Sequence, residues 1–248
     1  MPSWVEQAIR RGILTTRYPN QPATPVETPL TSRPPLPRPG TPIPPSAVAA
    51  CPVGALSQTS VDRGRCIRCA RCIPVGLEFA GAAEAATRTR GALVVPSGKP
   101  PVVTSTPGPL SSLGRSLHVF MVDVGSCNAC NLEVLALANP YYDSQRLGIF
   151  FTNSPRHADV LVVVGVPTEE MVEPLWRAYE ALPAPKAVLA VGVCPISGGV
   201  FAGTDGLRDS LGGILPVDVF VPGCPPTPLN VLDGLLELAG RGRRPREA

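Results

Sequence analysis

The second half of the chain alternates short apolar runs with stretches of helical periodicity. Apolar runs bounded by turn residues predict buried strands, and apolar residues three or four apart predict helices with one buried face. The expected strands cover 117–124, 147–151, 159–165, 186–193 and 217–221, and the expected helices cover 131–138, 169–182 and 229–238. Apolar strands alternating with helices predict a flavodoxin-like α/β fold, a parallel sheet with helices on both faces.

The first half has a different pattern. Residues 1–46 hold 12 of the 32 prolines. Because proline has no backbone N–H to donate, this stretch is a poor former of helix or sheet. Within them, residues 4–14 are expected to form one short helix, which either lies on a membrane or partner or is a tail ordered only by contact. The expected organisation is a Pro-rich extension over 1–46, a cysteine module over 47–95, a linker over 96–115, an α/β domain over 116–240 and a basic tail over 241–248.

Three local elements are expected in and near the cysteine module. Ser46 is expected to cap a short helix through Ala50 that delivers Cys51. A weak helix is expected over 82–87, and a short strand over 92–95.

Charge and hydropathy exclude several classes of protein. A net charge of +3 is too small to indicate a nucleic-acid partner. No stretch approaches the roughly 20 apolar residues of a membrane span. Glu6, Arg10 and Arg11 interrupt any apolar core of a signal peptide, so we expect a cytoplasmic protein. In that reducing compartment, eight cysteines indicate metal binding more than disulfides.

The first four cysteines have the spacing of iron–sulfur ligands. Cys51 precedes a proline, and Cys66, Cys69 and Cys72 follow at two-residue gaps. This order resembles the back half of a two-cluster ferredoxin, in which C-x2-C-x2-C-x3-C-P runs bind [4Fe-4S] clusters. Gly76 stands where that family has another cysteine, and the three cysteines expected before Cys51 are absent, so one cluster remains. Structural zinc and disulfides stay open as alternatives.

The other four cysteines are placed at strand ends. Cys127 and Cys130 open a predicted helix, while Cys194 and Cys224 each follow a strand and precede a proline. Because parallel strands end at one rim of their sheet, these loops are expected to meet at a single site.

The α/β half also resembles a known family, the small electron-transfer subunit shared by [NiFe] hydrogenases and respiratory complex I. The resemblance covers residues 117–239 and is carried by Gly125-Ser-Cys-Asn-Ala-Cys-Asn-Leu-Glu133, Ser154-Pro-Arg-His-Ala-Asp159, Gly192-Val-Cys-Pro-Ile-Ser-Gly-Gly199 and Pro222-Gly-Cys-Pro-Pro226. Complex I subunits usually have adjacent cysteines at the first motif. The C-x2-C spacing here is that of energy-converting membrane-bound hydrogenases and formate hydrogenlyase. Ala129 departs from the glycine common there.

The resemblance implies that Cys127, Cys130, Cys194 and Cys224 ligate a proximal [4Fe-4S] cluster near the active site of a separate large subunit. With the ferredoxin-like module, whose fusion departs from the family, the chain would relay electrons through two [4Fe-4S] clusters and have no turnover alone. Its expected partners are a hydrogenase or complex-I-like large subunit and other iron–sulfur and membrane subunits. Those partners would hold it on the cytoplasmic face of the membrane. The rival functions are a complex-I-like quinone oxidoreductase subunit and a zinc-stabilised scaffold or binding protein.

Four further residues are candidates for a role in the protein. Three of them have two interpretations each, and the fourth, His118, has only a structural one. Glu133 either stabilises a helix N-terminus or serves a proton path or subunit contact. His118 begins a strand and is expected to be structural. Arg156 and His157 are expected either to tune the cluster or contact the large subunit, or to be ordinary surface residues.

Overall fold

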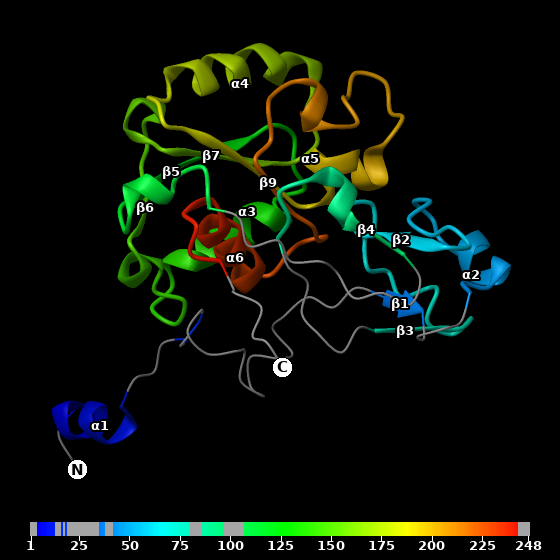
Figure 1. The fold of residues 1–248 in the computed structure, drawn as a ribbon, viewed down its shortest axis with the longest axis horizontal. Coiled ribbons are helices and arrows are strands. Elements are labelled where there is room, and N and C mark those ends of the chain that lie inside the picture. The colour runs from blue at the N-terminus through cyan, green and yellow to red at the C-terminus, as the bar shows by residue number, and fades with distance from the viewer. Residues whose placement is uncertain are drawn as a thin grey trace.

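A five-stranded parallel sheet forms the centre of the molecule (Figure 1). The structure is a computed structural model that describes residues 4–12, 16, 18, 35–37, 42–79, 86–96 and 107–242. The strands are β5 (Leu117–Asp123), β6 (Ile149–Phe151), β7 (Val160–Val164), β8 (Ala187–Val191) and β9 (Val219–Val221). They lie in the order β6-β5-β7-β8-β9, which is the flavodoxin-like order 2-1-3-4-5. The predicted α/β sheet is therefore confirmed.

Helices cover both faces of the sheet, as the sequence predicted. α3 (Ala129–Leu135) and α6 (Pro228–Leu238) pack on one face, and α4 (Glu169–Ala181) packs on the other. Every residue of β7 and β8 is buried, which explains their uninterrupted apolar sequences.

One helix was not predicted. The apolar run over 186–193 indicated a single strand, but β8 ends at Val191 because Gly192 has a φ of +93°. The short helix α5 (Val193–Ser197) begins at once and carries Cys194. A glycine with positive φ turns the chain more sharply than a hydrophobicity pattern reveals.

The first cysteine module is small and rich in loops. It contains α2 (Pro45–Ala49), an antiparallel pair of β2 (Ser60–Asp62) and β4 (Val94–Pro96), and a second pair of β1 (Pro35–Pro37) and β3 (Leu77–Phe79). Ser46 is not the helix cap that we expected: Pro44 is the N-cap, Pro45 takes the first helical position, and no side chain caps the helix. The fixed φ of proline suits that position.

Two other local predictions in the module had different outcomes. The predicted strand over 92–95 is shifted, because a 3₁₀ helix covers Arg90–Leu93 before β4. Of the weak helix predicted over 82–87, only Ala86 and Thr87 lie within the described residues. Thr87 forms an antiparallel bridge to Phe220 of β9.

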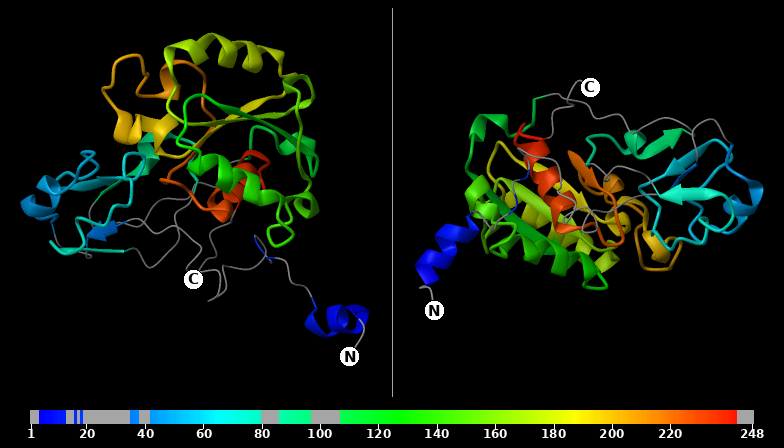
Figure 2. Two further views of the ribbon diagram at one scale, coloured as in Figure 1. Left: turned by 180° about the vertical axis from the view of Figure 1, so that it is seen from behind. Right: turned by 90° about the horizontal axis from the view of Figure 1, so that it is seen from below.

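The module lies beside the sheet domain in all three ribbon views (Figures 1 and 2), and the segments around it are bound to that domain. Tyr18, only 2% exposed, donates its hydroxyl hydrogen to Asp233 on α6. The other carboxylate oxygen of Asp233 accepts from the Ala86 backbone N–H at 3.1 Å. Arg88 forms an ion pair of 2.8 Å with Glu237. A segment before the module and a segment within it, between β3 and β4, therefore meet on α6.

Two regions expected to be free at the surface also make specific contacts. Leu110, within the stretch predicted as a linker, is fully buried, and its N–H donates to the Leu238 carbonyl at 3.0 Å. Arg241, grouped by the sequence with a basic tail, donates to the Leu147 carbonyl at 2.7 Å. Within those two ranges, 97–106 and 243–248 lie outside the described residues.

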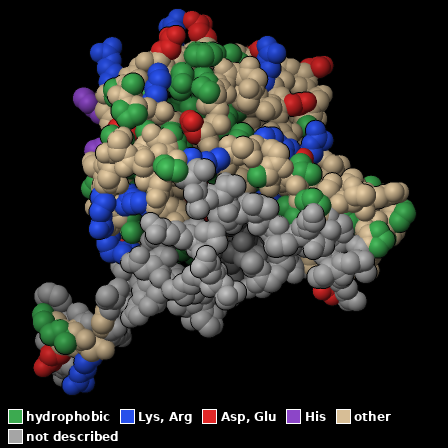
Figure 3. All heavy atoms as spheres, in the orientation of Figure 1, with side chains coloured by type: hydrophobic (Ala, Val, Ile, Leu, Met, Phe, Trp, Pro, Cys, Tyr) green, Lys and Arg blue, Asp and Glu red, His purple; other side chains and the backbone are tan. Residues whose placement is uncertain are grey.

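Charged and apolar side chains are interspersed on the visible face of the molecule. On the face drawn in Figure 3, basic and acidic side chains both occur over the sheet domain, and apolar side chains appear among them over α4. The N-terminal helix α1 (Trp4–Arg11) forms where the sequence predicted one. None of the helices within the described ranges is long and apolar enough to cross a membrane.

Candidate iron–sulfur sites

The second cysteine set lies at one rim of the sheet, as its strand-end positions predicted. The register pairs Asp123 with Val164, Val164 with Val191, and Val191 with Val221. The carboxyl ends of these four parallel strands therefore lie side by side along one edge of the sheet. The loops that leave three of them carry Cys127, Cys130, Cys194 and Cys224.

A polar network shapes the loop between β5 and α3. The Asp123 carboxylate accepts from the Gly125 N–H at 2.9 Å, from the Ser126 hydroxyl at 2.6 Å and from the Asn131 amide at 2.5 Å. Burial alone would raise the pKa of Asp123, but these hydrogen bonds outweigh it and lower the pKa. Asn128 takes a left-handed φ of +70° between the two cysteines. The sequence did not single out Asp123, which precedes the ligand motif, or Asn131, which lies within that motif but is not a cysteine.

Glycines give the sulfur atoms room at this rim. A Cβ at Gly192 would lie 2.6 Å from Cys130 Sγ, and one at Gly199 would lie 3.3 Å from Cys194 Sγ. Gly192 and Gly199 have φ values of +93° and +59°. The cradle for the Cys130 sulfur therefore depends on the absence of a side chain at residue 192.

The four thiols of the second set interact electrostatically. Burial, and to a smaller extent the neighbouring cysteines, raise the pKa of Cys130 to about 12 and that of Cys194 to about 11. Burial and Cys127 also raise the pKa of Cys224. Crowded thiols of this kind keep their protons until a positively charged metal centre displaces those protons.

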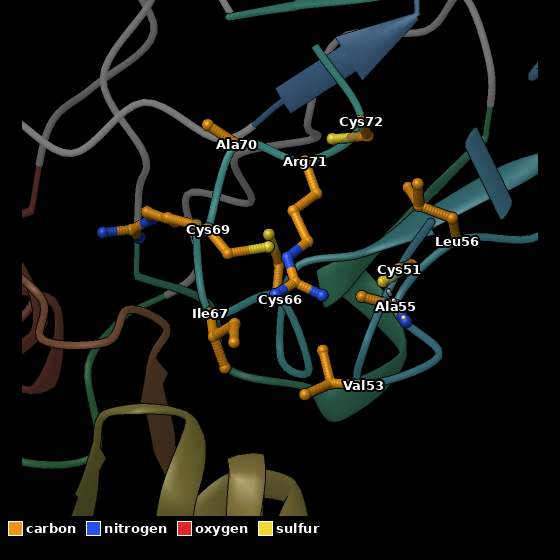
Figure 4. Close-up of a pocket in the computed structure, with 11 residues that line it drawn as sticks. Cys51, Val53, Ala55, Leu56, Cys66, Ile67, Cys69, Ala70, Arg71 and Cys72 are labelled. Carbon is orange, nitrogen blue, oxygen red and sulfur yellow. Dashed lines mark hydrogen bonds between the residues drawn. The ribbon is translucent and has the colours of Figure 1, made fainter. Parts of the chain in front are cut away.

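The first cysteine set surrounds a pocket in the small module (Figure 4). Cys51, Cys66, Cys69 and Cys72 line it, and their sulfur atoms face the same space. The apolar lining includes Val53, Ala55, Leu56 and Ile67. The Ala55 N–H donates to Cys51 Sγ at 3.2 Å. Burial raises the pKa of Cys66 to about 11.

The backbone of the first site curves around its pocket. Arg68 and Ala70, on either side of Cys69, have left-handed φ values of +57° and +61°. Each such residue costs about 1–2 kcal/mol relative to ordinary backbone. Left-handed residues let successive N–H groups converge into the concave anion-binding turns found at many iron–sulfur sites.

The spacing of the thiols tests the zinc alternative. Sulfur ligands of one zinc ion lie about 3.8 Å apart, because each is about 2.3 Å from the metal at a tetrahedral angle. Among the described residues, which include all eight cysteines, no three Cys, His, Asp or Glu side chains form a group that could hold a single ion. Each set supplies four thiols, which is the number that a [4Fe-4S] cluster takes, one sulfur ligand on each iron.

The two sites are packed against each other. Ile67 of the first loop packs against a buried cluster of Val166, Val193 and Cys194 at the second site. The Ser197 hydroxyl, which is buried, donates to the Gly64 carbonyl at 2.7 Å. The sequence assigned the two sets to separate modules and missed Ser197, because its partner lies 133 residues away.

The structure distinguishes the remaining candidate residues. Glu133 is half-buried in α3, burial raises its pKa, and it lies within electrostatic range of Cys130. His118 lies in β5, stacks on Phe150, and has Nδ1 3.5 Å from the Asp159 carboxylate, in keeping with a structural role. Arg156 and His157 precede β7, at the end opposite the cysteines. The length of that strand, about 13 Å, separates their backbone from the rim, which favours a large-subunit contact or an ordinary surface role over tuning of the second cluster.

Comparison with known proteins finds relatives of the α/β half. Residues 127–238 match the family described as NADH ubiquinone oxidoreductase, 20 Kd subunit. The probable membrane-bound hydrogenase subunit mbhJ of Pyrococcus furiosus is 47% identical over 124 residues, covering 50% of this chain and 74% of that protein. Formate hydrogenlyase subunit 7 of Escherichia coli is 41% identical over 131 residues, 53% of this chain and 51% of that one. An NADH-quinone oxidoreductase subunit of Desulfovibrio desulfuricans is 40% identical over 134 residues, 53% of this chain and 72% of that one.

Proposed function

Since the chain belongs to the family of the 20 kDa subunit of NADH–ubiquinone oxidoreductase, we propose that it is the electron-transfer subunit of a membrane-associated [NiFe]-hydrogenase-type complex. Proteins of this family typically bind one [4Fe-4S] cluster. The observation that carries the proposal is the pair of four-thiol sites, in contact within one chain.

Each of the two sites supplies the four cysteine ligands of one cluster. Cys51, Cys66, Cys69 and Cys72 hold one [4Fe-4S] cluster in a ferredoxin-like N-terminal module. Cys127, Cys130, Cys194 and Cys224 hold the other. A bound cluster accepts and returns electrons one at a time, at a potential set by the charges and hydrogen bonds around it.

The residues of the chain supply what such a relay requires. Apolar side chains around the first pocket restrict water, and two thiols of each set are buried. Ile67 of the first loop packs against the apolar cluster that contains Cys194, which brings the two loops together. Glu133 is a candidate for a proton path or a subunit contact.

A partner large subunit is expected to cover the rim near Cys130. Two leucines of α3, Leu132 and Leu135, are 61% and 57% exposed, which is unusual for large apolar side chains on a helix of the central fold. The partner, together with other iron–sulfur and membrane subunits, would hold the chain on the cytoplasmic face of the membrane.

A complex-I-like quinone oxidoreductase subunit is the second candidate, since relatives of both kinds match the chain. The two residues between Cys127 and Cys130 favour the hydrogenase, because complex I subunits usually have adjacent cysteines there. Nickel analysis of the large subunit that copurifies with this chain distinguishes them. Nickel-free partner protein that reduces a quinone would overturn the hydrogenase assignment.

Iron and acid-labile sulfide analysis of the anaerobically purified complex tests the relay itself. The expected content attributable to this chain is about eight irons and eight sulfides. Cys69→Ser is expected to remove the first cluster and Cys194→Ser the second, each seen as loss of one electron paramagnetic resonance signal. Stoichiometric zinc without sulfide would instead identify a zinc-stabilised scaffold.

A further inference from the structure

Arg68 lies between the two cysteine sites and contacts both. It is one of the residues that line the first pocket, one position before Cys69. Its left-handed backbone, with a φ of +57°, is uncommon for a long side chain. Such a conformation persists where surrounding contacts hold it.

The guanidinium of Arg68 reaches the loop that carries Cys224. Nη2 donates to the Pro222 carbonyl at 3.1 Å, and Nη1 is 3.4 Å from the Pro225 carbonyl. These two carbonyls bracket Cys224 in sequence. One planar group therefore binds the loop on both sides of a predicted ligand, which the single ammonium of a lysine does less well.

The positive charge of Arg68 acts on the cysteines of both sites. The Arg68 guanidinium lies within electrostatic range of Cys66 and Cys224, one thiol from each set, and an arginine side chain keeps its positive charge at neutral pH. Ile67 packs against the cluster that contains Cys194, and the Ser197 hydroxyl donates to the Gly64 carbonyl, so both contacts hold the same loop in place. The cation is thus fixed between the two sets of sulfur ligands.

We propose that Arg68 is a positioning residue that couples the two iron–sulfur sites, by fixing the Cys224 loop and by placing one positive charge beside both clusters. The proposal rests on the proposed function, since it requires a cluster at each site. A fixed cation stabilises the reduced, more negative form of each cluster and raises both reduction potentials. The occupancy of one site then affects the other through a shared side chain.

The test is a redox titration of the holoprotein, followed by electron paramagnetic resonance, for the wild type and three variants. Arg68→Gln removes the charge and is expected to shift the reduction equilibrium of both clusters roughly threefold to tenfold toward the oxidised form, up to about 59 mV for one electron. Arg68→Lys keeps the charge and is expected to restore most of both potentials. The control, Arg71→Gln, neutralises another lining residue of the first pocket and is expected to move the first potential alone.

Each result decides a separate point. If Arg68→Gln retains both clusters and leaves the second potential unchanged, or if Arg68→Lys shifts both as far as Arg68→Gln does, the coupling role is refuted. If Arg68→Gln does not fold, Arg68→Met keeps the apolar stem and answers the same question. A wild-type protein without eight irons and eight sulfides would instead overturn the proposed function.

Discussion

Gly192→Ala is the sharpest test of the cradle at the second site. Alanine at a φ of +93° costs about 1–2 kcal/mol in backbone strain. Its Cβ would lie 2.6 Å from Cys130 Sγ, well inside the roughly 3.5–4.0 Å of ordinary carbon contacts. The sulfur must therefore move by about 1 Å or more, and overpacking of this kind costs about 1–3 kcal/mol further.

A matched control separates the two costs. Gly203 has a similar φ of +77° with nothing within 4 Å of an added Cβ, so Gly203→Ala carries the strain without the collision. The extra destabilisation of Gly192→Ala over Gly203→Ala corresponds to a melting temperature lower by roughly 2–12 °C for a domain of this size.

The assay combines thermal unfolding with iron content. Gly203→Ala is expected to keep about eight irons, and Gly192→Ala about four, with the electron paramagnetic resonance signal of the second cluster lost. The reasoning is refuted if the two variants melt together and both keep eight irons. That result would mean that the Cys130 sulfur does not occupy the space above Gly192.

Three further outcomes are expected. Tyr18→Phe leaves the buried Asp233 without its hydroxyl donor and should cost about 1–3 kcal/mol by denaturant titration; an unchanged midpoint would contradict the anchoring contact. Asp123→Ala removes three hydrogen bonds from its loop and should lower the occupancy of the second cluster alone, measured as iron per chain. Because the pKa values of Cys66 and Cys130 are raised to about 11 and about 12, both thiols are protonated at pH 8, and cluster reconstitution should release about one proton from each in a pH-stat. Proton release that rises as the pH is lowered from 9 to 7 would contradict those raised values, because thiols with ordinary pKa values gain protons over that range.

The features that were predicted from sequence are those with a local pattern. Apolar runs identified the strands, and helical spacing identified α4, because burial on a sheet or helix face recurs every two to four residues. The common rim of Cys127, Cys194 and Cys224 followed from parallel strand direction. These inferences needed no knowledge of contacts between distant residues.

The features that were missed depend on partners far along the chain. Arg68 pairs with a carbonyl 154 residues later, and Tyr18 with a carboxylate 215 residues later. An arginine between two cysteines looks like an ordinary charged surface residue, and a tyrosine in a Pro-rich stretch looks like part of a tail. The spacing of apolar residues along the chain carries no information on such pairings between distant residues. The close packing of the two sites is therefore visible only in the three-dimensional structure.

The meeting of two chain segments on α6 has a consequence for biosynthesis. Asp233 accepts hydrogen bonds from Tyr18 and Ala86, and Glu237 pairs with Arg88, so the anchors of the small module belong to a late part of the chain. A ribosome makes α6 after every cysteine of both sites, and a chain folds in the order in which it emerges. The small module therefore emerges during translation before its partners on α6 exist, and its contacts with Asp233 and Glu237 form only when the last helix folds.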